Sequence, residues 1–102
     1  MSDITVADLA ALGDTALILD IREDDEFAVV RVPGVLHIPM SELLRRLPEV
    51  PTQVPVHVIC AVGGRSAQVA EYLHGTGMNA VNVLGGTVAW ERAGFAVESG
   101  AV

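Results

Sequence analysis

The only cysteine of this chain, Cys60, begins the segment "CAVGGRS", whose residue types and spacing could produce a reactive sulfur. Gly63 and Gly64 can adopt positive φ and turn successive backbone N–H groups toward one point, which makes a small concavity suited to an anion. Good helix formers over residues 67–75 place a helix N-terminus directly after this loop. The partial positive charge of that terminus and the full charge of Arg65 both lower the pKa of a nearby thiol, so we expect a thiolate near neutral pH.

The alternative for Cys60 is a small buried hydrophobic side chain, which is the commoner fate of a lone cysteine. One thiol cannot form an internal disulfide or a zinc site of the CxxC type, and we expect neither a metal nor a cofactor. His57 lies three residues earlier on the same expected strand, so alternation places it on the opposite face of the sheet, away from Cys60. We interpret His37, His57 and His74 as structural or surface residues.

The elements that must position this loop follow from hydrophobic patterning. Short apolar segments rich in β-branched residues alternate with segments of helical periodicity, which predicts a parallel sheet flanked by helices. The expected strands cover residues 3–5, 17–21, 35–39, 56–60 and 80–84. The expected helices cover 6–12, capped by Thr5 and ended by Gly13, and about 24–29, 41–47, 64–74 and 86–92. We expect one domain over residues 1–102 and a frayed tail over the last five residues.

Several unusual residues follow the expected strands. In open parallel α/β sheets, binding sites form beyond the carboxyl ends of the strands, and these ends share one edge. The loop that begins at Cys60, the residues Asp20 and Arg22, and the pair Gly85–Gly86 should therefore lie on one rim. We expect Asp20 and Arg22 to pair with each other or with loop backbone and to support the site rather than react.

The charge of the chain restricts its partners. Its formal net charge is −7, and all six basic residues are arginine. This balance disfavours binding to nucleic acid or to an anionic membrane surface. No apolar run approaches the roughly 18 residues of a membrane helix, and the N-terminal segment lacks the basic and apolar regions of a signal peptide. We therefore expect a cytoplasmic protein.

Four segments, taken in order, resemble the single-domain rhodanese-like sulfurtransferases. They are "LILDIRE", "VPGVLHIP", "CAVGGRSAQVA" and "VLGGTVAW", of which the third is similar to the CxxGxRS active-site loop of that family. The resemblance implies a three-layer α/β fold, with a five-stranded parallel sheet and helices on both faces. One departure is Arg31, which stands where members of the family usually have a histidine.

The resemblance also implies a reaction. Cys60 would attack the sulfane sulfur of a small anionic donor such as thiosulfate, and it would hold that sulfur as a persulfide until cyanide or a thiol takes it. A persulfide on a partner protein would be another possible donor. Arg65 would hold the loop and attract the donor, and inward N–H groups would stabilise the persulfide anion. The expected binding residues are Ala61, Val62, Gly63, Gly64, Arg65 and Ser66.

Two other functions remain open for a chain of this pattern. The same fold carries phosphatases and arsenate reductases, but these resemble one another in having five residues between cysteine and arginine, whereas four separate Cys60 from Arg65. Rhodanese-like domains also serve as non-catalytic binding modules, which typically lack the cysteine. Both differences favour the sulfurtransferase.

Overall fold

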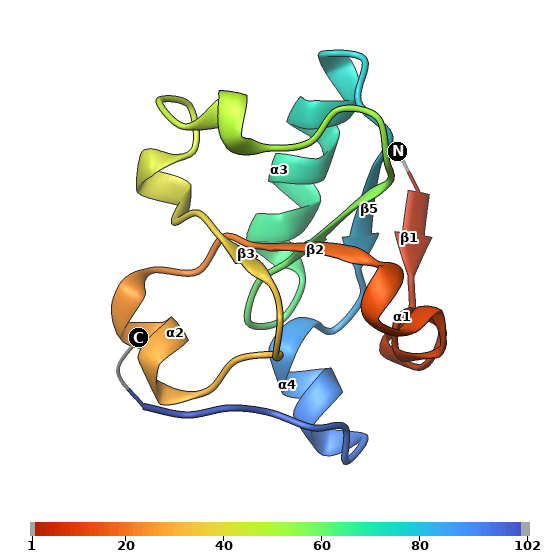
Figure 1. Ribbon diagram of the computed structural model, residues 1–102, viewed down its shortest axis with the longest axis vertical. Helices are drawn as coiled ribbons and strands as arrows, with labels where there is room; N and C mark the ends of the chain where they lie inside the picture. Colours follow the sequence, from red (N-terminus) through yellow and green to blue (C-terminus); the bar gives the residue numbers. More distant parts are fainter. Residues whose placement is uncertain (1, 101–102) are drawn as a thin grey trace.

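In a computed structural model, which describes residues 2–100, five strands form one sheet in which every neighbouring pair is parallel (Figure 1). The strand order is β1-β5-β4-β2-β3. The strands are β1 (Ser2–Ile4), β2 (Leu17–Asp20), β3 (Leu36–His37), β4 (Val56–Ile59) and β5 (Ala80–Val83). The predicted fold class is confirmed, and the carboxyl ends of β2 and β4 lie side by side because Asp20 pairs with Ile59.

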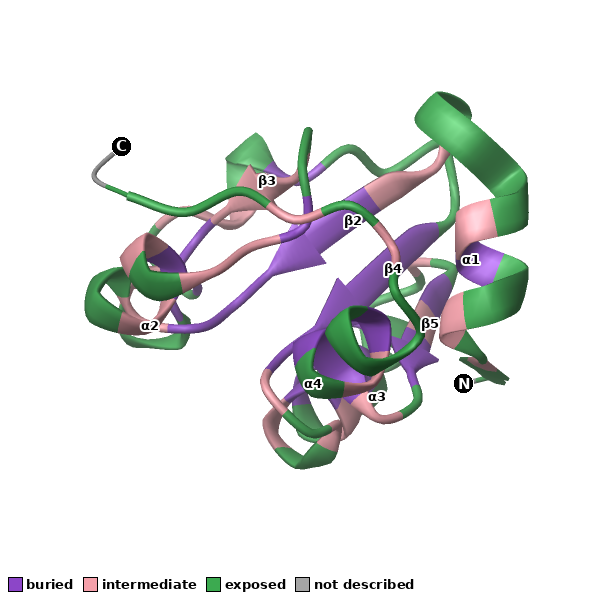
Figure 2. Cartoon of the chain, turned by 90° about the horizontal axis from the view of Figure 1, so that it is seen from below, coloured by how far each residue is buried: buried purple, intermediate pink, exposed green. Residues whose placement is uncertain are grey.

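Helices cover both faces of the sheet. They are α1 (Val6–Leu12), α2 (Asp24–Val29), α3 (Gly64–Gly75) and α4 (Gly86–Arg92), with short 3-10 turns at Gly13–Thr15, Met40–Glu42 and Leu47–Glu49. Side chains alternate between the two faces of the strands, and the buried ones form two clusters, one on each face of the sheet. Buried residues are concentrated along the central strands (Figure 2).

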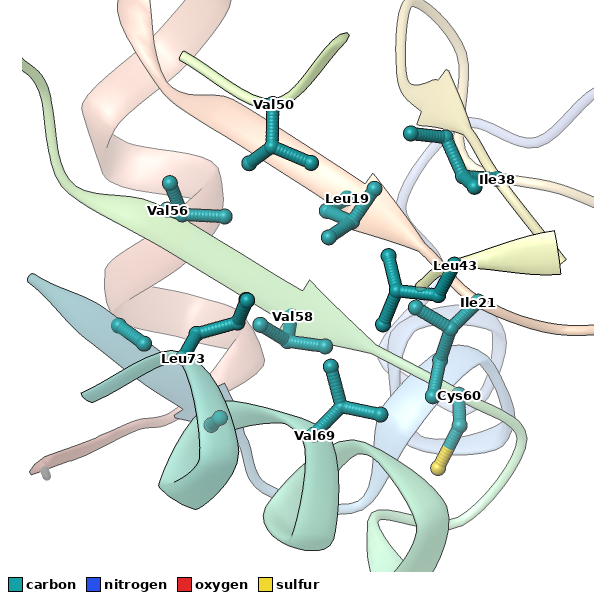
Figure 3. Close-up of a cluster of buried hydrophobic side chains, with 12 residues drawn as sticks. Leu19, Ile21, Ile38, Leu43, Val50, Val56, Val58, Cys60, Val69 and Leu73 are labelled. Atoms are coloured by element: carbon teal, nitrogen blue, oxygen red, sulfur yellow. The ribbon is translucent and has the colours of Figure 1, made fainter. Parts of the chain in front are cut away.

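One cluster packs under α3, and its members drawn in Figure 3 include Leu19, Val58, Cys60 and Val69. The other joins Leu9 of α1 and Trp90 of α4 to Ile18, Ile59 and Val83 of the sheet. Cys60 therefore lies on the α3 side. Among the described residues, the helices are all too short or too polar to span a bilayer.

The predicted helix over 41–47 is wrong. This segment forms two 3-10 turns joined by a turn, and within it the N–H of Arg46 reaches back to the carbonyl of Glu42 at 3.1 Å. Pro48 has no N–H to donate and disfavours the α conformation at Leu47, so an α-helix cannot continue there. The expected strand 35–39 is likewise shortened to two residues, ahead of Pro39.

Two ends of the chain also differ from expectation. The first strand covers residues 2–4 rather than 3–5, because Thr5 is the N-cap of α1 and accepts a hydrogen bond of 3.1 Å from the N–H of Asp8. The tail is not frayed where it is described, since Glu98 and Arg31 exchange two backbone hydrogen bonds of 2.9 Å and the N–H of Gly100 donates to Ala28. Residues 101–102 of the predicted frayed tail lie outside the described residues.

Candidate active site

The Cys60 loop is a strand-to-helix turn that curls around one sulfur atom. Cys60 follows β4 directly, and Gly63 at the N-cap of α3 has φ +104°, a conformation that L-residues with side chains rarely adopt. This bend aims the N–H of Gly63 at Sγ over 3.1 Å, while the N–H of Ser66, in the first turn of α3, lies 3.3 Å from Sγ. The sulfur therefore sits in a nest of backbone donors, in which Gly63 has the expected positive φ whereas Gly64, the first residue of α3, does not.

The electrostatics of this nest favour the thiolate. Burial, with Cys60 only 1% exposed, acts to raise the pKa of its thiol. The hydrogen bond between Sγ and the Ser66 hydroxyl, together with those from the N–H groups of Ser66, Gly63 and Val62, acts in the opposite direction and outweighs burial, so the pKa is lowered. The direction is the one the sequence predicts, but the largest lowering contributions are hydrogen bonds rather than the charge of Arg65.

Ser66 is positioned by a hydrogen bond to Asn82, a residue that the sequence did not single out. Its Oγ donates a hydrogen bond of 2.6 Å to Oδ1 of Asn82 on β5, and Oγ also lies 3.3 Å from Sγ of Cys60. All three side chains are buried. The available signal was a single polar residue inside the otherwise apolar strand "AVNVL".

Arg65 forms an ion pair with Glu26 of α2. Its Nη1 and Nη2 donate to the two oxygens of Glu26, each over 2.8 Å, in a bidentate pair. The hydrogen bond from Arg65 is the largest cause that lowers the pKa of Glu26 to about 2. This geometry ties the loop to α2, which is the holding role expected for Arg65, whereas attraction of a donor remains a prediction.

Asp20 and Arg22 form the buried pair that the sequence predicts. Nε and Nη2 of Arg22 donate to the Asp20 carboxylate over 2.8 to 3.1 Å, and the Arg22 N–H also donates to Asp20 over 2.9 Å. The guanidinium also donates to the carbonyls of Glu26 and Val30. Arg22 therefore ties the C-terminal half of α2 to the end of β2.

Arg31, at the position of the usual family histidine, is used in the same structural way. Its Nη1 donates to the carbonyls of Phe27 and Gly100 over 3.1 and 2.8 Å, and its Nε lies 3.6 Å from the carboxylate of Glu98. The guanidinium also lies over the ring of Phe27, 5.1 Å from its centroid. Arg31 thus joins the end of α2 to the C-terminal segment.

The first turn of α4 supports the loop from its other side. The N–H of Thr87 donates to the Cys60 carbonyl over 2.9 Å, and the N–H of Val88 donates to the Ala61 carbonyl over 3.0 Å. Gly86 has φ +58°, and a Cβ there would collide with the carbonyl oxygens of Cys60 and Ala61. The pair Gly85–Gly86 therefore does lie on the rim that carries Cys60.

The histidines are placed away from the sulfur chemistry. His57 Nδ1 lies 2.9 Å from the Leu17 carbonyl oxygen, and His37 Nε2 lies 2.7 Å from that of Arg22. His37 also stacks on Phe27 with ring centroids 3.8 Å apart, and His74 is exposed near the end of α3. Over residues 2–100, no three of the His, Cys, Asp and Glu side chains gather in a group able to hold a metal ion.

Known proteins resemble this chain in sequence and in architecture. The family described as "Rhodanese-like domain" matches residues 5–93. A sulfurtransferase of Allochromatium vinosum is 37% identical over 89 residues, which cover 84% of this chain and 83% of the relative. The crystal structure of a rhodanese-related protein from Thermoplasma volcanium matches with a TM-score of 0.92 and 34% identity, over 96% of this chain and 98% of that one.

A longer protein also contains this fold. The thiosulfate sulfurtransferase of Pseudomonas aeruginosa matches with a TM-score of 0.83 and 33% identity, and the match covers 98% of this chain but 20% of that protein. The family match, the sulfurtransferase relative and the cysteine loop at the end of β4 agree with one another. The chain belongs to the rhodanese-like domain family of sulfurtransferases.

Proposed function

We propose that this protein transfers sulfane sulfur and carries it as a persulfide on Cys60. The observation that supports this most strongly is the nest around Sγ, in which the N–H groups of Gly63 and Ser66 point at the sulfur from 3.1 and 3.3 Å. Donors arranged in advance around a sulfur atom stabilise a thiolate, and after transfer they stabilise the negative charge of a persulfide. The same donors lower the pKa of the thiol, which favours the thiolate as the attacking form.

The proposed reaction has two steps. The Cys60 thiolate attacks the outer sulfur of thiosulfate, an S–S bond to Cys60 forms, the S–S bond of the donor breaks, and sulfite leaves with the electron pair. Cyanide or a thiolate then attacks the outer sulfur of the Cys60 persulfide. Thiocyanate or a new persulfide leaves, and the Cys60 thiolate is regenerated.

The loop geometry disfavours phosphate chemistry for the same site. Four residues separate Cys60 from Arg65, and the described N–H bonds converge on a single sulfur atom. Both terminal nitrogens of Arg65 are engaged by Glu26, whereas phosphoryl transfer needs such donors on the equatorial oxygens. A one-atom site of this kind suits sulfur better than a tetrahedral oxyanion.

The test is intact-protein mass spectrometry after incubation with thiosulfate, followed by a cyanide chase. We expect a gain of one sulfur atom that cyanide removes and that Cys60→Ser does not show. Glutathione persulfide serves as a second donor in the same assay. A chain whose thiol reacts with iodoacetamide but gains no sulfur from thiosulfate, from glutathione persulfide or from a peptide persulfide contradicts the proposal.

A further inference from the structure

Arg65, which was expected to attract an anionic donor, and its neighbours Arg22 and Arg31 are already paired with groups of this chain. Arg65 is paired with Glu26, and Arg22 is paired with Asp20 at 2.8 Å and is only 3% exposed. The Nη1 of Arg31 is engaged by two carbonyl oxygens, while its Nε faces Glu98. None of these three side chains therefore offers a free positive charge to a dianion such as thiosulfate.

Beside the loop lies an open groove between α2 and α4. It has a volume of about 300 Å³ and is lined by Val29 of α2, Ala61 of the loop, and Val88 and Glu91 of α4. The groove adjoins the site directly, because the N–H of Val88 holds the Ala61 carbonyl and Glu26, on its α2 side, holds Arg65.

The rim of this groove is apolar. Val29 is 72% exposed and Val88 is 37% exposed, and Val62, next to Ala61 in the loop, is 68% exposed. Three exposed valines around a reactive loop are a surface on which another molecule would gain free energy by covering them. A small inorganic anion gains nothing from contact with apolar side chains, whereas a protein can bury them against its own apolar residues.

The exposed charge at the groove is negative. Glu91 is an exposed carboxylate of its lining, whereas Arg22, the basic residue of the lining, is buried and paired with Asp20. The whole chain carries a formal charge of −7. Such a surface repels a dianion and steers a cationic partner toward the groove.

We propose that the groove between Val29 and Val88 is the docking surface for a basic protein that delivers sulfur to Cys60 as a cysteine persulfide. This inference rests on the proposed function and names its donor. The Cys60 thiolate attacks the outer sulfur of the partner's Cys–S–SH group. An S–S bond forms between Sγ of Cys60 and that sulfur. The S–S bond of the partner breaks, its cysteine leaves as a thiolate, and the proton stays on the transferred sulfur.

The test uses the full chain and four defined donors. Two are ten-residue peptide persulfides in which leucines and either lysines or glutamates flank one cysteine, and the others are glutathione persulfide and thiosulfate. The rate of Cys60 persulfide formation is followed by mass spectrometry at low and high salt. We expect the lysine peptide to react about tenfold faster than the glutamate peptide at low salt, with the difference narrowing as salt rises.

Variants of the groove locate the effect. Glu91→Lys should narrow the preference for the lysine peptide, and Val88→Asp should slow the glutamate peptide further. Matched controls are Glu71→Lys, an exposed carboxylate of α3, and Val54→Asp, an exposed valine that precedes β4. Neither control should change the preference, and rates are normalised to alkylation of Cys60 by iodoacetamide.

The outcomes separate this inference from the proposed function. Equal rates for the two peptides, or a thiosulfate rate that exceeds that of the lysine peptide, would overturn the docking surface while leaving the persulfide mechanism intact. Equal shifts from Glu71→Lys and Glu91→Lys would also overturn it, because the effect would then belong to net charge. A thiol that accepts iodoacetamide but no sulfur from any of the four donors contradicts the proposed function itself.

Discussion

The hydroxyl of Ser66 donates to Oδ1 of Asn82 over 2.6 Å, and the same oxygen lies 3.3 Å from Sγ of Cys60. A buried polar chain thus runs from the sulfur through α3 to β5. In the thiol form Sγ donates to Oγ, and in the thiolate form the one hydroxyl proton can turn from Asn82 to the sulfur. The Ser66 side chain is the largest of the hydrogen-bonding causes that lower the pKa of the thiol, after the opposing effect of burial. In Ser66→Ala this contribution is lost, so we expect the pKa of Cys60 to rise. Iodoacetamide alkylation measured across pH should show the midpoint moving upward and a slower reaction at neutral pH.

The control separates this effect from damage to the fold. Ser66→Ala leaves the Asn82 amide without its buried partner, which costs about 1–3 kcal/mol of stability. The double variant Ser66→Ala/Asn82→Leu removes both polar groups and should regain part of that stability while keeping the raised pKa. An alkylation profile of Ser66→Ala that coincides with that of the unaltered chain would refute the role of the hydroxyl.

The pair of Arg65 and Glu26 predicts how stability depends on pH. The folded-state pKa of Glu26 is lowered from its ordinary 4.5 to about 2, so its stabilising contribution is present above pH 4.5 and is lost as the pH falls through about 2. Because the two side chains are 37% and 34% exposed, solvent screening limits this contribution to about 1 kcal/mol. Urea unfolding between neutral pH and about pH 2 should show a smaller acid loss for Arg65→Ala.

A matched variant for this pH series is Arg45→Ala. Arg45 is 70% exposed and pairs with Glu42 over 3.3 Å, so it lies on the surface away from the loop. Its loss should leave the acid-dependent part of the stability nearly unchanged. An Arg65→Ala curve that parallels the unaltered chain down to about pH 2 would contradict the assignment to Glu26.

Most of the strands and the Cys60 loop could be predicted from the sequence, because residues close together in the chain determine them. Runs of β-branched residues, the glycines at 63 and 64 and the helix formers after them act over a few positions, and the sheet and nest follow. The pairing of Arg65 with Glu26 was not predictable in the same way, since 39 positions separate the two residues. Asn82 was missed for this reason too, because its partner lies 16 positions away.

The one misassigned helix had a different cause. Over 41–47 the apolar spacing resembles a helix, but Pro48 removes a donor and disfavours the preceding conformation, and that local effect dominates. The ordered tail is again a tertiary effect, because the backbone of Glu98 pairs with that of Arg31.

Gly86 predicts a steric test of the loop. Its φ of +58° costs an L-residue about 1–2 kcal/mol, and a Cβ would also collide with the carbonyl oxygens of Cys60 and Ala61. Overpacking of this kind typically adds about 1–3 kcal/mol. We expect Gly86→Ala to lower the free energy of unfolding by about 2–5 kcal/mol and to slow alkylation of Cys60.

Substitutions at two other glycines separate the cost of positive φ from the cost of the steric collision. Gly77 has φ +96° with open space around its Cα, so Gly77→Ala measures the conformational strain alone. Gly75 lies at the end of α3 without positive φ or close neighbours, so Gly75→Ala should be nearly neutral or slightly stabilising. If Gly86→Ala costs no more than Gly77→Ala, close packing of Gly86 against the loop is disproved.

The buried pair of Asp20 and Arg22 should couple stability to the site. Removing one partner of a buried ion pair costs about 3–5 kcal/mol, because the remaining charge has no counter-ion. We expect Arg22→Met to lose this amount in urea unfolding and also to slow sulfur transfer, since the guanidinium holds the carbonyls of Glu26 and Val30 in the C-terminal half of α2. In the double variant Asp20→Asn/Arg22→Met the uncompensated charge is gone, so part of the stability should return. The slower transfer should persist in the double variant, because α2 still lacks its anchor and Glu26 no longer holds Arg65 in place. Additive losses in the double variant would show instead that the two side chains act independently.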